Sequence, residues 1–310
     1  MRIGLMHGDA GGQTLEQQIQ QLIQEEQDGF DCAWFGQIFG GDSMTIIALA
    51  GQRTSKIEFG TVVVPTYTRH PFAMAQQAMT VYAATQGRFT IGVGPSHQMV
   101  VESIWGLSYD KPAKHIREYL DVLIPLCRQG RVGYAGDLYK VNGTISVLEL
   151  KDLEPMPVLI SALAPVMLKL AGSVADGTAT WMTGPKTIET HVVPSITKAA
   201  TEAGRPAPRV VCGLPVCVAD DATAAREAAA KGFVIYGQLP NYKRMLDREG
   251  VAGPADVAIV GSEAQVEQQI RALASAGATD FNGAIFPTGP NPAESIARTY
   301  ACVKSLVGKV

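Results

Sequence analysis

The side chains that could do chemistry in this sequence are imidazoles, amides and aromatic rings at the ends of short apolar segments. His7 ends the first such segment, Gln37 ends the second, and His97 follows the fourth. An imidazole can exchange a proton near neutral pH, because its unperturbed pKa is about 6.5. Tyr67 and Trp181 lie at two other segment ends, where an aromatic ring can contact a flat ligand. This set suits a site in which a bound cofactor performs the difficult chemistry while the protein holds and orients it.

Several other chemistries lack the residues that they require. No two acids stand together after the apolar segments, as a glycosidase needs, and no lysine stands there to form a Schiff base. The zinc pattern HExxH, clustered Cys and His residues and the hydrolase pattern GxSxG are absent from the sequence. We therefore expect neither a metal ion nor a nucleophilic serine.

Eight short apolar runs, each followed by an amphipathic stretch, are the elements that must position these side chains. The runs span residues 2–7, 32–37, 57–64, 89–93, 157–161, 177–182, 210–218 and 281–286. Residues 57–64 form a continuous, largely β-branched run, which is typical of a parallel strand buried on both faces. The alternation predicts an α/β protein with one domain, residues 1–310, folded as a single (β/α)8 TIM barrel. In this fold the active site forms in the loops after the strands.

The regular alternation is interrupted at three places. We expect insertions after strands 4 and 7, at about residues 95–112 and 236–256, and a hairpin at residues 133–148, before strand 5. Residues 222–276 are expected to form one irregular helical region. The rival fold is an open doubly wound sheet, which would carry GxGxxG after its first strand. That place holds His7-Gly8-Asp9-Ala10-Gly11-Gly12, whose glycine spacing differs.

Composition limits the partners. Of the 310 residues, 46% are hydrophobic and 18% charged, and the net charge is -3, as in a globular chain with a large core. No basic stripe and no run of about 20 apolar residues occurs, so we expect no nucleic-acid or membrane partner. The first segment lacks the long apolar region of a signal peptide, which predicts a cytoplasmic protein. Five dispersed cysteines indicate reduced thiols.

Several motifs resemble the luciferase-like monooxygenase superfamily. Residues 58–71, EFGTVVVPTYTRHP, are similar to its third strand and following loop, and residues 87–94, GRFTIGVG, to its fourth strand. Residues 170–172, LAG, and 175–177, ADG, resemble its fifth helix and sixth strand. The run Tyr67-Thr68-Arg69-His70-Pro71 is similar to deazaflavin-dependent methylenetetrahydromethanopterin reductases. Residues 94–97 and 106–109 resemble an actinobacterial subgroup that uses coenzyme F420.

The resemblance implies a bacterial-luciferase-like barrel that binds F420 or FMN, and a homodimer. It also implies a cis peptide bond between Val62 and Val63, at the end of strand 3. Family members often carry Asp or His at the end of strand 2, where Gln37 stands here, and several deazaflavin members carry an acid where His97 stands.

The strand ends and the resemblance together define the candidate site. His97 is the candidate catalytic residue, as a proton-transfer group or as an anchor for the cofactor. We expect the cofactor phosphate near the backbone N–H groups of residues 163–164 and 183–184. The candidate cofactor-binding residues are Gln37, Val62, Val63, Val64, Gly94, Pro95, Ser96, His97, Leu163, Ala164, Trp181, Met182, Thr183 and Gly184, and the candidate substrate-binding residues are His7, Phe39 and Tyr67.

Three functions are compatible with these residues. The first is an F420-dependent oxidoreductase that transfers a hydride between the deazaflavin and a small organic substrate. The second is an FMN-dependent monooxygenase that uses reduced flavin and oxygen. The third is a non-catalytic flavin-binding protein, which the presence of Gln37 in place of an acid or imidazole supports. His115 and His191 lie in helical segments and are expected at the surface, and His70 is either a helix cap or a functional residue.

Overall fold

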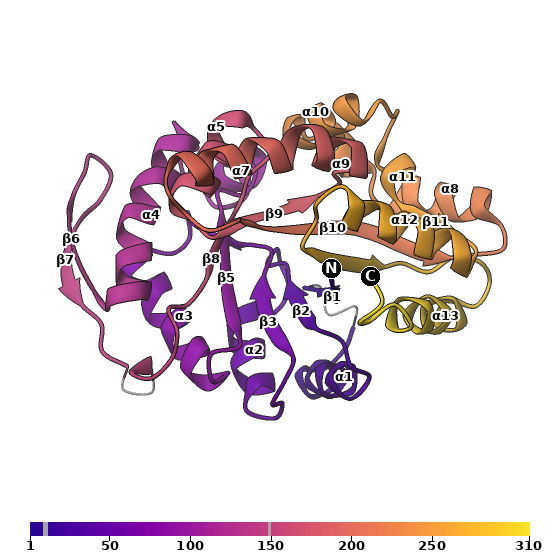
Figure 1. The fold of residues 1–310 in the computed structure, drawn as a ribbon, viewed down its shortest axis with the longest axis horizontal. Coiled ribbons are helices and arrows are strands. Elements are labelled where there is room, and N and C mark those ends of the chain that lie inside the picture. The colour runs from indigo at the N-terminus through magenta and orange to yellow at the C-terminus, as the bar shows by residue number, and fades with distance from the viewer. Residues whose placement is uncertain (9–11, 148–149) are drawn as a thin grey trace.

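The computed structural model describes residues 1–8, 12–147 and 150–310, and its centre is a closed barrel of eight parallel strands (Figure 1). Each strand pairs with its neighbours in parallel, and β9 pairs with β10 so that the sheet closes. The predicted single TIM barrel is therefore confirmed. In barrel order the strands are β1 (Arg2–His7), β2 (Cys32–Phe35), β3 (Glu58–Thr61), β5 (Phe89–Gly94), β8 (Val158–Ser161), β9 (Gly177–Trp181), β10 (Arg209–Val218) and β12 (Asp280–Ile285).

Helices surround the barrel and bury one apolar side against it, as expected for strands that are apolar on both faces. A reciprocal capping box between Thr14 and Gln17 begins the first helix, and Pro71 occupies the first turn of the third. The helices are α1 (Leu15–Gln27), α2 (Ser43–Gly51), α3 (Pro71–Ala84), α4 (Pro112–Gln129), α5 (Pro165–Val174), α6 (Pro185–Thr187), α7 (Val193–Glu202), α12 (Glu263–Ser275) and α13 (Pro292–Lys304), with π-helical turns η1 (Val100–Ile104) and η3 (Ile188–Val192).

The three interruptions of the barrel pattern lie where the sequence predicts them, with one difference. An antiparallel hairpin, β6 (Arg131–Ala135) and β7 (Lys140–Thr144), projects beside α4 (Figure 1). The insertion after β10 contains α8 (Ala222–Gly232), α9 (Val234–Gln238), α10 (Pro240–Glu249) and α11 (Pro254–Val257). It also contains β11 (Ile259–Gly261), which pairs with the end of β10. The prediction of one irregular helical region over residues 222–276 was therefore wrong in omitting β11. A run of three residues is too short to give a recognisable strand pattern.

The third strand is broken in two. β3 ends at Thr61, β4 (Val64–Pro65) follows, and the peptide bond between Val62 and Val63 is cis, as the family resemblance implies. Both pieces pair with β5, with Val64 beside Val93 and Phe59 beside Phe89. The two residues between them therefore leave the ladder and lie at the carboxyl end of the barrel.

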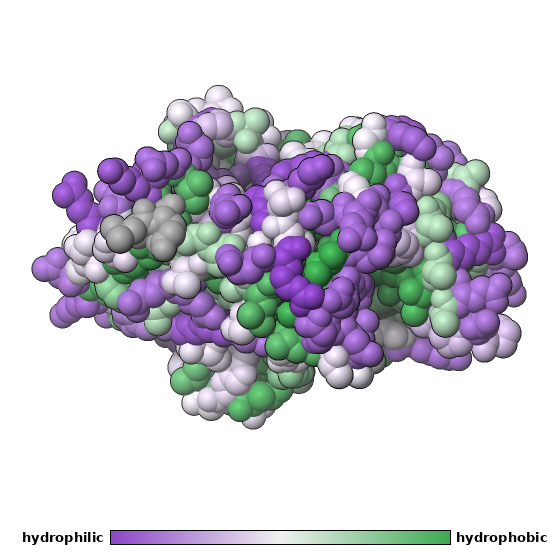
Figure 2. All heavy atoms as spheres, turned by 90° about the horizontal axis from the view of Figure 1, so that it is seen from below, coloured by the Kyte–Doolittle hydropathy of each residue, from purple (hydrophilic) through white to green (hydrophobic). Residues whose placement is uncertain are grey.

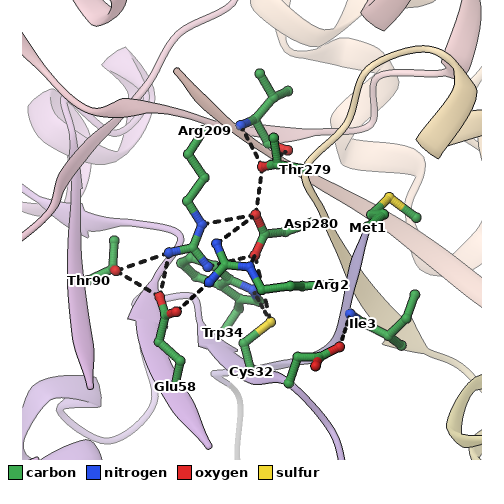
Figure 3. A network of polar contacts seen from close by, with 12 residues as sticks. Met1, Arg2, Ile3, Cys32, Trp34, Glu58, Thr90, Arg209, Thr279 and Asp280 are labelled. Atoms are coloured by element: carbon green, nitrogen blue, oxygen red, sulfur yellow. Dashed lines mark hydrogen bonds and ion pairs between the residues drawn. The ribbon is translucent and has the colours of Figure 1, made fainter. Parts of the chain in front are cut away.

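A network of charged side chains closes the amino end of the barrel (Figure 3). Arg209 donates to both carboxylate oxygens of Asp280, at 2.9 and 2.6 Å, and also pairs with Glu58. Arg2 bonds both of the same acids. The guanidinium of Arg209 lies 4.7 Å from the ring centre of Trp34, which is fully buried. Two cations and two anions are thus paired, and the network blocks this end of the barrel.

Two histidines expected at the surface are instead buried, so that prediction was wrong. His115 Nε2 lies 2.9 Å from Thr66 Oγ1, and its ring stacks on Tyr67 at 4.1 Å between centroids. His191 Nε2 lies 2.8 Å from the carbonyl oxygen of Leu163. Both occupy barrel-facing sides of their helices, which the short apolar pattern around each histidine did not reveal.

Hydrophilic residues cover most of the face shown in Figure 2, with smaller groups of hydrophobic residues between them. Across the part of the chain that the structure describes, none of the helices is both long and apolar enough to cross a membrane.

Candidate active site

A cleft of about 320 Å³ opens at the carboxyl ends of the strands, where this fold places its active sites. Its walls come from the ends of strands β1, β5, β8 and β9, from the Val62–Val63 segment, and from helices α4, α5 and α10. Most of the lining is apolar, which suits a flat aromatic ligand. The lining residues are Met6, Val62, Val63, Pro95, Ser96, His97, Tyr109, Pro112, Ala113, Ser161, Leu163, Ala164, Val166, Met167, Ala179, Thr180, Trp181, Asn241 and Tyr242.

The Val62–Val63 segment forms one wall of this cleft, and it packs closely against β5 because Gly94 of β5 has no side chain. A Cβ atom on Gly94 would lie 2.7 Å from Val63 Cγ2 and would also overlap Ser161 Oγ, both closer than real contacts allow. Glycine at this position therefore permits the close packing of β5 against its neighbours. The bulged backbone and the apolar valine side chains together present a surface on which a ring can lie.

His97 lines the cleft two residues beyond Pro95. Ser96 has a φ of +60°, and this left-handed residue turns the chain between the two. The imidazole packs edge-on against Tyr242, with 5.5 Å between ring centroids. Burial lowers the pKa of His97 below its usual value of 6.5, because the charged form loses its hydration. Near neutral pH the ring is therefore mostly uncharged and can accept a proton.

An aromatic cluster joins the end of β9 to the insertion helices beside the cleft. Trp181 packs edge-on against Phe233 and Tyr236, at 6.1 and 5.6 Å between centroids, and Tyr236 packs against Tyr242. The indole Nε1 of Trp181 is buried and has no hydrogen-bond partner among the described residues. A buried donor of this kind costs free energy unless it is paired, so a bound ligand that accepts from it would be stabilised.

The two backbone segments expected to hold a phosphate differ in the structure. Leu163 and Ala164 line the cleft at the start of α5, as that expectation requires. Gly184, however, lies against the carboxylate of Glu249, which accepts hydrogen bonds from the backbone N–H groups of Lys186 and Thr187 at 3.1 and 2.8 Å. The Glu249 carboxylate thus occupies the backbone N–H groups at the start of α6 that a phosphate would otherwise bind.

Of the predicted site residues, eight line the cleft: Val62, Val63, Pro95, Ser96, His97, Leu163, Ala164 and Trp181. Four others, Val64, Gly94, Met182 and Thr183, are buried beneath its walls. Phe39 is 67% exposed, and the half-buried ring of Tyr67 stacks on His115. His7 faces a second cavity. The amide of Gln37 contacts the Ser43 hydroxyl, close to an Arg69–Asp42 ion pair. Asp9, a further strand-end acid, lies outside the described residues.

Sequence reasoning missed several residues of the cleft. Met6 and Ser161 are strand residues, and the inward side of each strand could have been assigned from the two-residue alternation. Tyr109 comes from the insertion after β5, and its hydroxyl donates to the carbonyl oxygen of Ser96. Tyr242 and Asn241 come from the insertion after β10, whose placement over the barrel depends on tertiary contacts and has no signal in the local pattern.

The closed barrel and this cleft define a class: a (β/α)8 protein with an apolar cleft at the carboxyl ends of its strands. The sequence pattern of the family described as luciferase-like monooxygenase matches residues 1–280. The chain belongs to this family.

Several relatives that match the chain are described as oxidoreductases. The 5,10-methylenetetrahydromethanopterin reductase of Methanopyrus kandleri is 30% identical over 243 residues, which cover 73% of this chain and 69% of that protein. A Mycobacterium tuberculosis protein placed among coenzyme F420-dependent oxidoreductases is 30% identical over 190 residues, and the chain spans about half of its length (54%). These relatives and the family membership support the assignment of the chain as an oxidoreductase.

Solved structures agree with this fold. The coenzyme F420-dependent tetrahydromethanopterin reductase of Methanopyrus kandleri superposes with a TM-score of 0.79 at 26% identity, covering 99% of this chain and 98% of that one. An F420-dependent secondary alcohol dehydrogenase in complex with an F420-acetone adduct also gives 0.79, at 20% identity, with the same coverage. A Baeyer-Villiger monooxygenase of Pseudomonas putida in complex with FMN gives 0.76 at 16% identity, covering 100% and 97%. The last two likenesses establish the fold alone.

Proposed function

We propose that this chain is an oxidoreductase that uses coenzyme F420 to transfer a hydride to or from a small organic substrate. The observation that carries the proposal is the apolar cleft between the Val62–Val63 segment and Trp181, with a largely uncharged His97 at its edge. The F420-dependent relatives favour the deazaflavin over FMN. The same proposal includes a cytoplasmic location and a homodimer. Light scattering of the purified protein tests the homodimer.

The residues of the cleft fit a deazaflavin. Two apolar walls face each other across it, and the buried, unpartnered Nε1 of Trp181 can donate to an acceptor on a ligand. Next to Leu163 and Ala164 lies another cavity, of about 430 Å³, whose lining includes Arg244, Arg248 and Asp247. The carboxylate of Asp247 pairs with Lys243, so the two arginines leave an excess of positive charge. These cations suit the phosphate-bearing end of the cofactor, because Glu249 already occupies the backbone donors at the start of α6.

When bound, the deazaflavin supplies or accepts the hydride. Its carbon in place of the reactive flavin nitrogen favours hydride transfer over oxygen activation. The protein must then handle the proton that accompanies the hydride at the oxygen or nitrogen of the substrate. His97 lines the cleft and is mostly uncharged near neutral pH, so it can accept this proton when the substrate is oxidised and return it in the reverse direction.

Fluorescence titration of the purified protein with F420 and with FMN tests the cofactor. We expect micromolar binding of F420 and binding of FMN at least tenfold weaker. Micromolar binding of FMN with no binding of F420 would instead support the flavin monooxygenase, and binding of either without turnover on any substrate would support a non-catalytic protein.

The His97→Gln variant separates the two roles of this residue, because glutamine can hydrogen-bond but cannot exchange a proton. We expect F420 affinity within about threefold of the wild type and turnover lower by about 10²-fold. A variant that retains both affinity and turnover shows that His97 has neither role.

A further inference from the structure

A second cavity of about 320 Å³ lies beside the cleft at the same end of the barrel. The two share a wall, because Met6 and Trp181 line both. The remaining lining comes from the ends of β1, β2 and β12, from α1 and Gln13 before it, and from α9 with the preceding Phe233. A ligand in this cavity therefore lies next to whatever occupies the cleft, with these two side chains on the shared wall.

One wall of this second cavity carries a buried acid–imidazole pair. His7 Nε2 lies 3.0 Å from Glu25 Oε2, and Gln21 Nε2 donates to the other carboxylate oxygen of Glu25 at 3.0 Å. The side chain of Glu25 is 0% exposed and that of His7 is 13% exposed. The His7 ring also stacks on Phe35, with 5.0 Å between centroids. Contacts on its edge and on its face thus fix the orientation of the imidazole.

Glu25 determines which nitrogen of His7 is available to a ligand. A carboxylate only accepts hydrogen bonds, so His7 Nε2 carries the proton that Glu25 accepts. In the neutral imidazole the other nitrogen, Nδ1, then has a free lone pair and accepts a hydrogen bond. Burying a carboxylate costs free energy unless hydrogen bonds and a partner compensate it. The buried Glu25 on α1 therefore depends on its contacts with His7 and Gln21, and these contacts hold His7 in one orientation.

The rest of the lining describes the ligand. Gln18 and Gln21 of α1, and Gln13 just before this helix, offer neutral amides, and Ile38 and Phe233 offer apolar surface. Among the described lining residues none is a lysine or an arginine, and Glu25 is already paired. An anionic ligand would lose its hydration here without gaining a cation, whereas a neutral ligand with one hydrogen-bonding group would be satisfied.

We propose that this second cavity binds the substrate, and that the substrate is a neutral molecule whose O–H or N–H group donates to His7 Nδ1. The proposal rests on the proposed function, because a substrate here must present its reacting carbon past Met6 and Trp181 to the cofactor in the cleft. His7 is then a substrate-binding and specificity-determining residue that holds a group of the substrate other than the reacting one. The proton of the reacting group, which enters the cleft, is exchanged with His97.

The test follows the five histidine rings of the cofactor-free protein by NMR, with ¹⁵N-labelled histidine and each ring assigned by substitution. Three probes share one ring and differ in a single group: cyclohexanol donates a hydrogen bond, cyclohexyl methyl ether only accepts, and cyclohexanecarboxylate is anionic. We expect cyclohexanol to shift the His7 Nδ1 resonance saturably. The ether and the carboxylate should bind at least tenfold more weakly.

Two variants complete the test. Glu25→Gln should abolish the selectivity for cyclohexanol, because the amide no longer fixes the protonated nitrogen. His70→Asn is the matched control, since His70 caps α3 at an exposed position and asparagine is also a good cap; it should leave the His7 response unchanged. The wild-type titration alone decides the proposal if Glu25→Gln does not fold.

A shift at His97 without one at His7, or equal binding of the carboxylate, overturns the proposal. The F420 titration separates this failure from that of the proposed function. F420 binding without a response of His7 refutes the substrate site only. A response of His7 without F420 binding refutes the cofactor and leaves a site for neutral donors.

Discussion

Replacing Arg209 by Met removes one cation from the network that closes the amino end of the barrel. The side chain of Arg209 is 13% exposed, and Asp280, to which it donates two hydrogen bonds, is 0% exposed. Removing one partner of a buried ion pair typically costs about 3–5 kcal/mol, because the other charge stays buried. Arg2 still bonds both acids in the variant, so we expect the lower end, about 3 kcal/mol.

Thermal unfolding followed by circular dichroism measures this cost. An unfolding entropy of about 2.1 cal/mol/K per residue gives about 0.65 kcal/mol/K for the chain, so 3 kcal/mol lowers Tm by about 5 °C. The matched control is Arg298→Met, because Arg298 pairs with Glu263 and Asp220 at the surface, where 36%, 51% and 87% of the side chains are exposed. A surface pair contributes about 1 kcal/mol or less. Equal losses in the two variants would refute the reasoning.

The cost of Arg209→Met should depend on pH. Burial alone raises the pKa of Asp280, but the hydrogen bonds and charge of Arg209, with the charge of Arg2, outweigh it and hold the pKa below its usual value. The stabilisation of this carboxylate is therefore fully present above about pH 4 and is lost as the pH falls through the lowered pKa. The difference in unfolding free energy between wild type and variant should shrink below about pH 4. A difference that stays constant down to pH 3 would contradict this assignment.

Two further outcomes are expected. Gly94→Ala forces the side chains of Val63 and Ser161 to move at the wall of the cleft, so this variant should bind F420 at least tenfold more weakly. The control Gly133→Ala, which has no atom within 4 Å of the new Cβ, should bind F420 normally. Equal F420 affinities of the two variants would contradict the packing argument. The five cysteines are buried and burial raises their thiol pKa values, to about 12 for two of them, so a thiol reagent at pH 8 should label the native protein slowly and the unfolded protein at all five sites. Rapid labelling of the native protein would show that the thiols are exposed.

The barrel could be predicted from the sequence because its strands are apolar on both faces and its helices are amphipathic. Those periodicities depend on neighbouring residues alone, and so do signals such as Pro71 at a helix start. The break of the third strand has no such local signal. The sequence predicted one continuous strand over residues 57–64, so the break was missed. Only the cis bond between Val62 and Val63 was expected, because residues 58–71 resemble a known family, and the structure confirms it.

The candidate site was predictable where it is built from strand ends, and it was missed where it depends on long-range packing. Pro95, Ser96 and His97 follow β5 directly and line the cleft. The acid that binds His7 is on α1, at a position where the helical pattern requires a residue facing the barrel. Nothing in the local sequence indicates that Glu249 reaches the start of α6, because that contact joins residues about 60 positions apart.

A crystal structure of the protein with bound F420 tests the central claim most directly. We predict that the deazaflavin ring lies in the cleft with one face on the Val62–Val63 segment, with His97 and the Nε1 atom of Trp181 within hydrogen-bond distance of the cofactor or of a bound substrate. The phosphate should lie beside Leu163 and Ala164. A ring bound outside this cleft, or a phosphate at the closed amino end of the barrel, would contradict the account.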